Sequence, residues 1–272
     1  MATTPPGSMN GVALVTGAAS GIGRAVAHTF IREGCTRIVL ADLDEASLQA
    51  VAKELESLNR NVRALAIKTD IASEPEVHRL IDTAVREFGA IHYAVNNAGV
   101  TSNPRVRTHE LNPEAWDKVV SVNLRGTWLC QRAELAQMVL QNPELQARAD
   151  VPPQRGAIVN VSSLFAILSH PTVGAYSASK AGILGLSRTD AIAYGQDGIR
   201  INSVLPGFVK TPMVEESIRR GANYESSISS VPMRRWGDPV EIAEAVVFLA
   251  SEKASLINGT ELTVDGGKQY AV

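Results

Sequence analysis

The stretch Thr16-Gly-Ala-Ala-Ser-Gly-Ile-Gly23 decides the fold. It follows an apolar, β-branched run at Gly11–Gly17 and opens a helical pattern that begins near Gly21 and stops at Gly34. Glycines where a strand turns into a helix permit a tight turn, and they let a pyrophosphate approach the N–H groups of the helix N-terminus. The spacing is Gly-x-x-x-Gly-x-Gly, and no Gly-Lys-Ser/Thr follows, so the stretch is not a P-loop. It predicts a dinucleotide-binding turn.

A carboxylate stands at the distance from this turn that ribose binding requires. Asp42 ends the next strand-like run about 20 residues after the glycines. A carboxylate there accepts hydrogen bonds from the ribose hydroxyls and repels a 2′-phosphate, and no Arg or Lys flanks it, so we expect NAD rather than NADP. The alternative is that Asp42 or Asp44 only caps the following helix.

Outward from the turn, short apolar runs alternate with longer amphipathic patterns. The strand-like runs are Gly11–Gly17, Arg37–Asp42, Val62–Asp70, Ile91–Asn97, Gly156–Ser163, Ile199–Gly207 and Gly259–Gly267. The helical patterns cover Gly21–Gly34, Asp44–Leu58, Glu74–Phe88, Pro113–Leu140, Gly174–Gly195 and Pro239–Leu249. Such alternation predicts an α/β fold: a single doubly wound (Rossmann) domain whose seven-stranded parallel sheet has helices on both faces.

Three stretches fall outside this alternation. Residues 1–10 are rich in Pro, Gly, Ser and Thr and are expected to be a flexible extension, with one domain over residues 11–272. Asn142–Gly156 is polar and contains proline, which is typical of a surface loop. Phe208–Gly237 follows a strand and carries several apolar residues, so we expect a lid over a substrate.

Composition excludes several classes of protein. The net charge is −2 over 272 residues, which is a poor match to nucleic acid, and no apolar run approaches the ~18 residues that span a membrane. With two cysteines and no recognisable targeting segment, we expect a reducing, cytoplasmic setting. The histidines and cysteines lack metal-ligand spacing, so no metal is expected.

Tyr176 and Lys180 form the candidate catalytic pair. Their i, i+4 spacing in Ala175-Tyr-Ser-Ala-Ser-Lys180 places both on one helix face. An ammonium beside a phenol favours the phenolate and lowers the phenol pKa, which makes a general acid/base. The pattern alone is not specific, because an ordinary surface tyrosine and lysine would give it too.

Six motifs in order make the sequence resemble the classical short-chain dehydrogenase/reductase family over about Gly11 to Gly267. They are Thr-Gly-x-x-x-Gly-Ile-Gly at 16–23, Asn-Asn-Ala-Gly at 96–99, Asn123 in Ser-Val-Asn-Leu, Ser163 in Asn-Val-Ser-Ser, Tyr-x-x-x-Lys at 176–180, and Pro-Gly-x-x-x-Thr at 206–211. The resemblance implies hydride transfer between a nicotinamide cofactor and an alcohol or carbonyl substrate.

The resemblance also implies a role for each position. Tyr176 would be the general acid/base, Ser163 would bind the substrate oxygen, Lys180 would hold the nicotinamide ribose, and Asn123 would position a relay water. The cofactor would contact Gly17, Ser20, Gly21, Ile22, Gly23, Asp42, Asp70, Ile71, Asn97, Ala98, Gly99, Tyr176, Lys180, Pro206, Gly207, Val209 and Thr211.

The leading hypothesis is therefore an NAD(H)-dependent oxidoreductase for a secondary alcohol or ketone. The apolar lid, with Phe208, Met213, Ile218 and Tyr224, favours a hydrophobic or cyclic small molecule. The alternatives are an NADPH-dependent ketoreductase of a biosynthetic pathway and a catalytically silent dinucleotide-binding regulator. The resemblance further implies a homo-oligomer, a tetramer or dimer built on the two long helices at 113–140 and 174–195.

Overall fold

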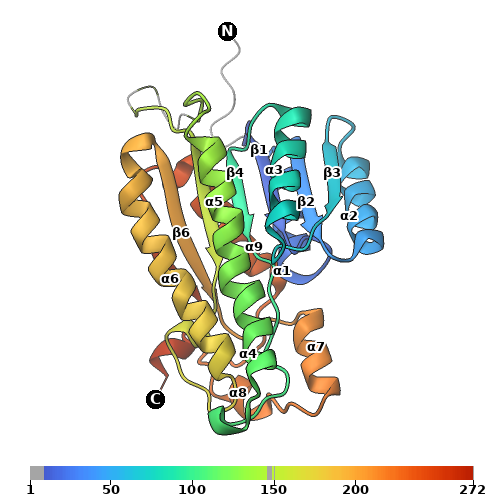
Figure 1. The fold of residues 1–272 in the computed structure, drawn as a ribbon, viewed down its shortest axis with the longest axis vertical. Helices are drawn as coiled ribbons and strands as arrows, with labels where there is room; N and C mark the ends of the chain where they lie inside the picture. The colour runs from blue at the N-terminus through green and yellow to red at the C-terminus, as the bar shows by residue number, and fades with distance from the viewer. Residues whose placement is uncertain (1–8, 146–148, 150, 272) are drawn as a thin grey trace.

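The computed structural model describes residues 9–145, 149 and 151–271. Its centre is one seven-stranded sheet, all parallel, in the order β3-β2-β1-β4-β5-β6-β7 (Figure 1). The strands are β1 Val12–Thr16, β2 Arg37–Asp42, β3 Arg63–Lys68, β4 Tyr93–Asn96, β5 Gly156–Val161, β6 Ile199–Pro206 and β7 Glu261–Val264. The strand order reverses between β1 and β4, and in such sheets the crevice beyond the carboxyl ends at this point binds ligands.

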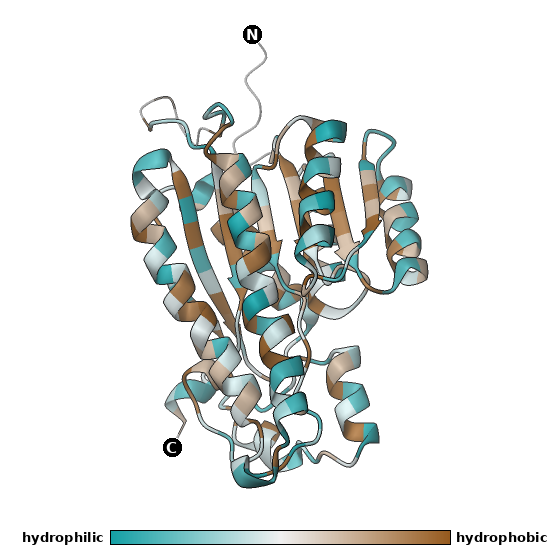
Figure 2. Ribbon diagram, viewed as in Figure 1, coloured by the Kyte–Doolittle hydropathy of each residue, from teal (hydrophilic) through white to brown (hydrophobic). Residues whose placement is uncertain are grey.

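Helices cover both faces of the sheet, which confirms the predicted fold class. The helices are α1 Gly21–Arg32, α2 Glu45–Leu58, α3 Glu74–Phe88, α4 Pro113–Val120, α5 Thr127–Met138, α6 Gly174–Tyr194, α7 Pro212–Arg219, α8 Glu225–Ser229 and α9 Pro239–Ala250. Residues of α1, α2 and α9 pack in one core cluster, and residues of α3, α5 and α6 in the other. The central strands are accordingly apolar along much of their length (Figure 2).

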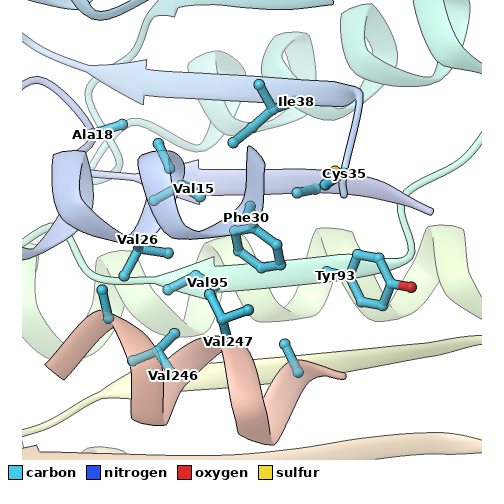
Figure 3. Close-up of a cluster of buried hydrophobic side chains, with 14 of the residues drawn as sticks. Val15, Ala18, Val26, Phe30, Cys35, Ile38, Tyr93, Val95, Val246 and Val247 are labelled. Carbon is cyan, nitrogen blue, oxygen red and sulfur yellow. The ribbon is translucent and has the colours of Figure 1, made fainter. Parts of the chain in front are cut away.

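The first core cluster joins the cofactor half of the sheet to the last helix. Phe30 of α1 stacks on Tyr93 of β4 with ring centroids 5.9 Å apart, and Val246 and Val247 of α9 pack on the same side (Figure 3). All four side chains are buried. Burial of apolar surface contributes about 25 cal/mol per Å², and it is the main force that holds α1 and α9 together on the same face of the sheet.

Two boundaries differ from the sequence prediction. Met9 was expected in the flexible extension, but it is buried in the first core cluster and its N–H donates to the Glu33 carbonyl at 3.1 Å. Residues 1–8 of that predicted extension lie outside the described residues. In the expected surface loop, Leu145 is also buried and pairs with Gln154 through the backbone, because its apolar side chain joins the core.

The predicted helix Pro113–Leu140 is interrupted. A π-helical turn, Ser121–Gly126, separates α4 from α5. Asn123 lies in this turn, and the Thr127 hydroxyl donates to its backbone carbonyl at 2.8 Å. π-turns inside helices widen the backbone and are frequent at functional sites. Hydrophobic periodicity does not predict this turn, because it identifies a helical stretch and not the hydrogen-bond pattern within it.

A buried polar network lies on the face of the sheet that α3, α5 and α6 cover. Asn96 of β4 donates to Glu134 of α5 at 2.9 Å and to Asn160 of β5 at 3.1 Å. Asn160 in turn donates to Gln131 at 2.6 Å and to Ser187 at 2.8 Å. Burial raises the pKa of the Glu134 carboxyl to about 7, because no positive charge compensates for the loss of water.

Candidate active site

A cleft of about 710 Å³ opens beyond the carboxyl ends of the strands. The glycine-rich turn and Asp42 line one part of it, and Ser163, Tyr176 and Lys180 line another. The segment between β6 and α9 contributes Met213 and lies below the sheet with α7 and α8 (Figure 1). The cleft therefore brings together residues that are far apart in the sequence at the place where a doubly wound sheet binds its ligand.

The turn after β1 has a backbone that other residues would not adopt. Gly17 has φ +66° and Gly21 has φ +53°. A Cβ at Gly17 would stand 2.8 Å from Ala98 Cα, and one at Gly23 only 2.0 Å from the Gly17 carbonyl oxygen. The Asn97 amide fixes the same turn by donating to the Thr16 and Gly17 carbonyls at 3.1 and 3.2 Å. The glycines thus keep the turn tight and free of side chains, as a bound pyrophosphate would need.

Asp42 supports the turn directly. Its carboxylate accepts hydrogen bonds from the Ala19 N–H at 3.0 Å and from the Asp44 N–H at 3.1 Å. The cap of α2 is Asp44, whose carboxylate accepts from the Ser47 N–H at 3.1 Å. Asp44, and not Asp42, therefore caps α2, and Asp42 lines the cleft.

Tyr176 and Ser163 present their hydroxyl groups to each other. Ser163 follows β5 and caps a short 3-10 turn, Leu164–Ala166, with its Oγ accepting from the Phe165 N–H at 3.1 Å. Tyr176 lies in the first turn of α6, and its hydroxyl is close enough to Ser163 for that side chain to lower the Tyr176 pKa. A substrate oxygen bound next to these two hydroxyls would contact a hydrogen-bond donor, Ser163, and a proton-transfer group, Tyr176.

Lys180 lies one helical turn after Tyr176. Its Nζ stands 5.9 Å from the Tyr176 ring centroid and donates to the Val161 carbonyl at 2.9 Å. The Ser162 hydroxyl, which the sequence reasoning missed, donates to the Lys180 carbonyl at 2.8 Å and ties α6 to β5. Lys180 is buried, and this burial lowers the pKa of its amine to about 8.

The expected depression of the Tyr176 pKa is wrong for the protein alone. Burial raises the pKa of Tyr176, and the Ser163 hydrogen bond lowers it only in part. The phenolate loses its hydration, whereas the Lys180 amine is itself disfavoured as a cation by the same burial. Lys180 therefore does not offset the effect of burial on the Tyr176 pKa in the protein alone.

Asn123 lies behind the cleft and does not line it. Its side chain is fully buried and clasps Val100, accepting from that residue's N–H at 2.8 Å and donating to its carbonyl at 2.9 Å. It also donates to Ser179 at 3.2 Å. The side-chain amide of Asn123 is therefore occupied by hydrogen bonds to Val100 and Ser179. A water bound at Asn123 would have to contact its backbone in the π-turn.

The cleft is lined by every predicted cofactor contact except Gly23, which packs against Gly17 beneath the surface. The lining residues that the prediction missed adjoin predicted ones in sequence or lie in α4, its π-turn and α7. They include Leu43, Thr69, Ala72, Val100, Lys118, Ser121, Val122, Ser162, Pro212 and Val214. Adjacency to a motif could have indicated most of them, but Lys118, Ser121 and Val122 depend on where the helix crosses the sheet.

The lid is only in part what its composition suggested. Met213 lines the cleft, whereas Ile218 is 47% exposed. The Arg219 and Arg220 guanidinium groups pair with Glu216, and Arg235 pairs with Glu241.

Across residues 9–145, 149 and 151–271, no helix is long and apolar enough to cross a membrane.

A glycine-rich turn at the switch point of a doubly wound sheet, with a carboxylate at the end of β2, defines a dinucleotide-binding protein. Comparison with known families agrees: residues 17–269 match the family model described as enoyl-(acyl carrier protein) reductase. The chain belongs to the short-chain dehydrogenase/reductase family of oxidoreductases.

Curated relatives and solved structures match over almost the whole chain. A 3-oxoacyl-(acyl-carrier-protein) reductase FabG of Thermotoga maritima is 35% identical, with 94% of this chain and 96% of the relative covered. A cis-4-hydroxycyclohexanecarboxylate dehydrogenase of Sinomonas cyclohexanicum is 38% identical, covering 94% and 95%. The crystal structure of levodione reductase superposes with a TM-score of 0.89 at 33% identity, covering 97% of this chain and all of that one.

Proposed function

We propose that the protein transfers a hydride between NAD(H) and a secondary alcohol or ketone of a hydrophobic, cyclic small molecule, with Tyr176 as general acid/base. The observation that carries the proposal is one cleft lined by the Tyr176–Ser163 hydroxyl pair and Lys180 as well as by Asp42 and the glycine-rich turn. The similarity to a cis-4-hydroxycyclohexanecarboxylate dehydrogenase and to levodione reductase supports the substrate class.

The cleft fits a nicotinamide dinucleotide. A Cβ at Gly17 or Gly23 would clash with the backbone, so the turn is kept free of side chains where a pyrophosphate would lie. The Asp42 carboxylate lines the same cleft and would accept hydrogen bonds from the adenosine ribose hydroxyls. When bound, the nicotinamide supplies the hydride acceptor or donor. Asp42 carries a charge that disfavours a ribose 2′-phosphate, which supports NAD over NADP.

The proton is handled by the protein. In alcohol oxidation, Tyr176 takes the proton from the substrate hydroxyl while Ser163 holds the same oxygen by a hydrogen bond. Lys180 would hold the hydroxyls of the nicotinamide ribose, and its ammonium places a positive charge near the phenol. Asn123 keeps Val100 and the β4–α4 connection in place, which orients the wall of the cleft.

A ketoreductase that uses NADPH is the second candidate, and the similarity to a 3-oxoacyl-(acyl-carrier-protein) reductase favours it. The test is a panel of cyclic alcohols, cyclic ketones and a 3-oxoacyl thioester, followed by the absorbance of NADH and NADPH. We expect the higher kcat/KM with NAD(H) and a cyclic substrate. A preference for NADPH with the thioester would replace our proposal by the second one.

A silent regulator is the remaining alternative, and the presence of both Tyr176 and Lys180 argues against it. Tyr176→Phe removes the proton-transfer group and keeps the ring. We expect turnover to fall by at least about 100-fold, the usual contribution of a general acid/base, while the affinity for NADH is kept. A variant that retains most of the rate would remove Tyr176 from this role.

We also propose that the chain forms a homo-oligomer through α4, α5 and α6. Trp116, Trp128 and Ile192 lie on these helices and are 39, 41 and 85% exposed. Large apolar side chains on one helical layer are typical of an interface between subunits. Light scattering coupled to gel filtration tests this: a mass of 29.0 kDa at micromolar concentration would contradict it.

A further inference from the structure

Four half-buried aromatic rings pack beside the predicted acid/base. They are Phe165, Phe208, Tyr224 and Trp236, and we call them the aromatic cluster. The Phe208 ring centroid lies 6.0 Å from Phe165, 6.1 Å from Tyr224 and 6.4 Å from Trp236, all close to edge-on. Phe165 follows Ser163 by two residues, and Tyr224 lies close enough to Tyr176 to act on it electrostatically. The cluster therefore lies near Ser163 and Tyr176, just outside the residues that line the cleft.

Arg105 adds a positive charge to this cluster. Its Nη1 donates to the Tyr224 hydroxyl at 2.9 Å, and its guanidinium carbon lies 5.6 Å from the Tyr224 ring centroid. The Tyr224 hydroxyl donates onward to Ser217 at 3.2 Å. Arg105 comes from the connection between β4 and α4, whereas Tyr224 lies between α7 and α8, so this contact joins the lid to the opposite wall.

The charge of Arg105 has no counter-ion among the residues that the structure describes. Arg219, Arg220 and Arg235 of the lid segment are each paired with a carboxylate, but Arg105 forms no ion pair with any described residue. It is half-buried, its bonded partner is a neutral phenol, and its field reaches His170 on the Phe165 side of the cluster. A half-buried guanidinium with unused N–H groups is poised to bind an anion.

We propose that Arg105 and the aromatic cluster form an anion subsite, which selects cyclic substrates that carry a carboxylate on the side of the ring away from the reacting carbon. This inference rests on the proposed function, because it takes the reacting oxygen to lie at Tyr176 and Ser163. The planar fork of a guanidinium matches a carboxylate in two hydrogen bonds. The aromatic rings supply an apolar surface for the ring between the two polar ends.

The test compares two probes that differ by one carboxylate group. Cyclohexanol and 4-hydroxycyclohexanecarboxylate are assayed with NAD on wild type, Arg105→Gln, Arg105→Lys and the control Arg107→Gln, an exposed arginine on the same connection. The readout is the ratio of kcat/KM for the acid to kcat/KM for the neutral alcohol. We expect Arg105→Gln to lower this ratio at least tenfold, mainly through KM, because the variant loses a charge-assisted hydrogen bond to the carboxylate.

Arg105→Lys is expected to keep part of the preference, because it retains the charge but not the fork, and Arg107→Gln is expected to keep all of it. An unchanged ratio in Arg105→Gln, or an equal loss for both probes, would overturn the anion subsite. Binding of unreactive cyclohexanecarboxylate to the NADH complex, measured by calorimetry, supplies a second readout. If wild type oxidises neither alcohol, the proposed function fails, and this binding and its loss in Arg105→Gln still decide the subsite.

Discussion

Glu134 gives the fold a dependence on pH that can be measured. Its carboxyl is fully buried and accepts one hydrogen bond from Asn96, and burial raises its pKa to about 7 from the 4.5 of a free glutamate. The second oxygen, Oε1, is buried and has no hydrogen-bond partner among the described residues. Between these two pH values the unfolded chain has lost the proton and the folded chain has kept it. Stability therefore falls as pH rises through this window.

The size of the effect follows from the two pKa values. At 1.36 kcal/mol per pH unit, the difference between 4.5 and about 7 amounts to about 3 kcal/mol. Glu134→Gln keeps the shape and the acceptor for Asn96 but does not ionise. We expect the free energy of unfolding of the wild type, measured relative to Glu134→Gln, to be highest below pH 4.5 and to fall by about 3 kcal/mol up to pH 7.

The assay is urea unfolding of both proteins at equal concentration from pH 4.5 to 8.5, followed by tryptophan fluorescence. Glu45→Gln, an exposed glutamate in the first turn of α2, serves as the control and should run parallel to the wild type. A difference between wild type and Glu134→Gln that stays constant within about 0.5 kcal/mol would refute the reasoning, because it would mean that Glu134 ionises normally in the fold.

Further predictions concern the cofactor half of the cleft. Gly23→Ala should reduce NADH affinity at least tenfold in a fluorescence titration, because its Cβ would meet the Gly17 carbonyl oxygen at 2.0 Å, whereas Gly185→Ala in α6 meets nothing within 4 Å and should bind normally. Asp42→Asn keeps an acceptor for the Ala19 N–H but loses the charge, so the ratio of kcat/KM for NADPH to that for NADH should rise at least about tenfold. An unchanged ratio would remove Asp42 from cofactor selection.

Local sequence determined the parts of the site that depend on one turn or one helix face. The role of the glycines after β1 could be predicted because glycine is the residue that readily adopts the positive φ of this strand-to-helix turn. Tyr176 and Lys180 were readable because i, i+4 spacing fixes a shared face whatever the helix packs against. The alternation of apolar runs and helical patterns likewise determined a parallel, doubly wound sheet.

Only the tertiary structure decided what depends on contacts between distant segments. The π-turn at Asn123, the clasp of its amide on Val100 and the meeting of Arg105 with Tyr224 join segments whose relative placement no local pattern encodes. The Tyr176 pKa was misjudged for the same reason: the Lys180 spacing is local, but the burial that outweighs it comes from the whole fold. Spacing sets which groups are neighbours, and desolvation by the assembled core sets their charge.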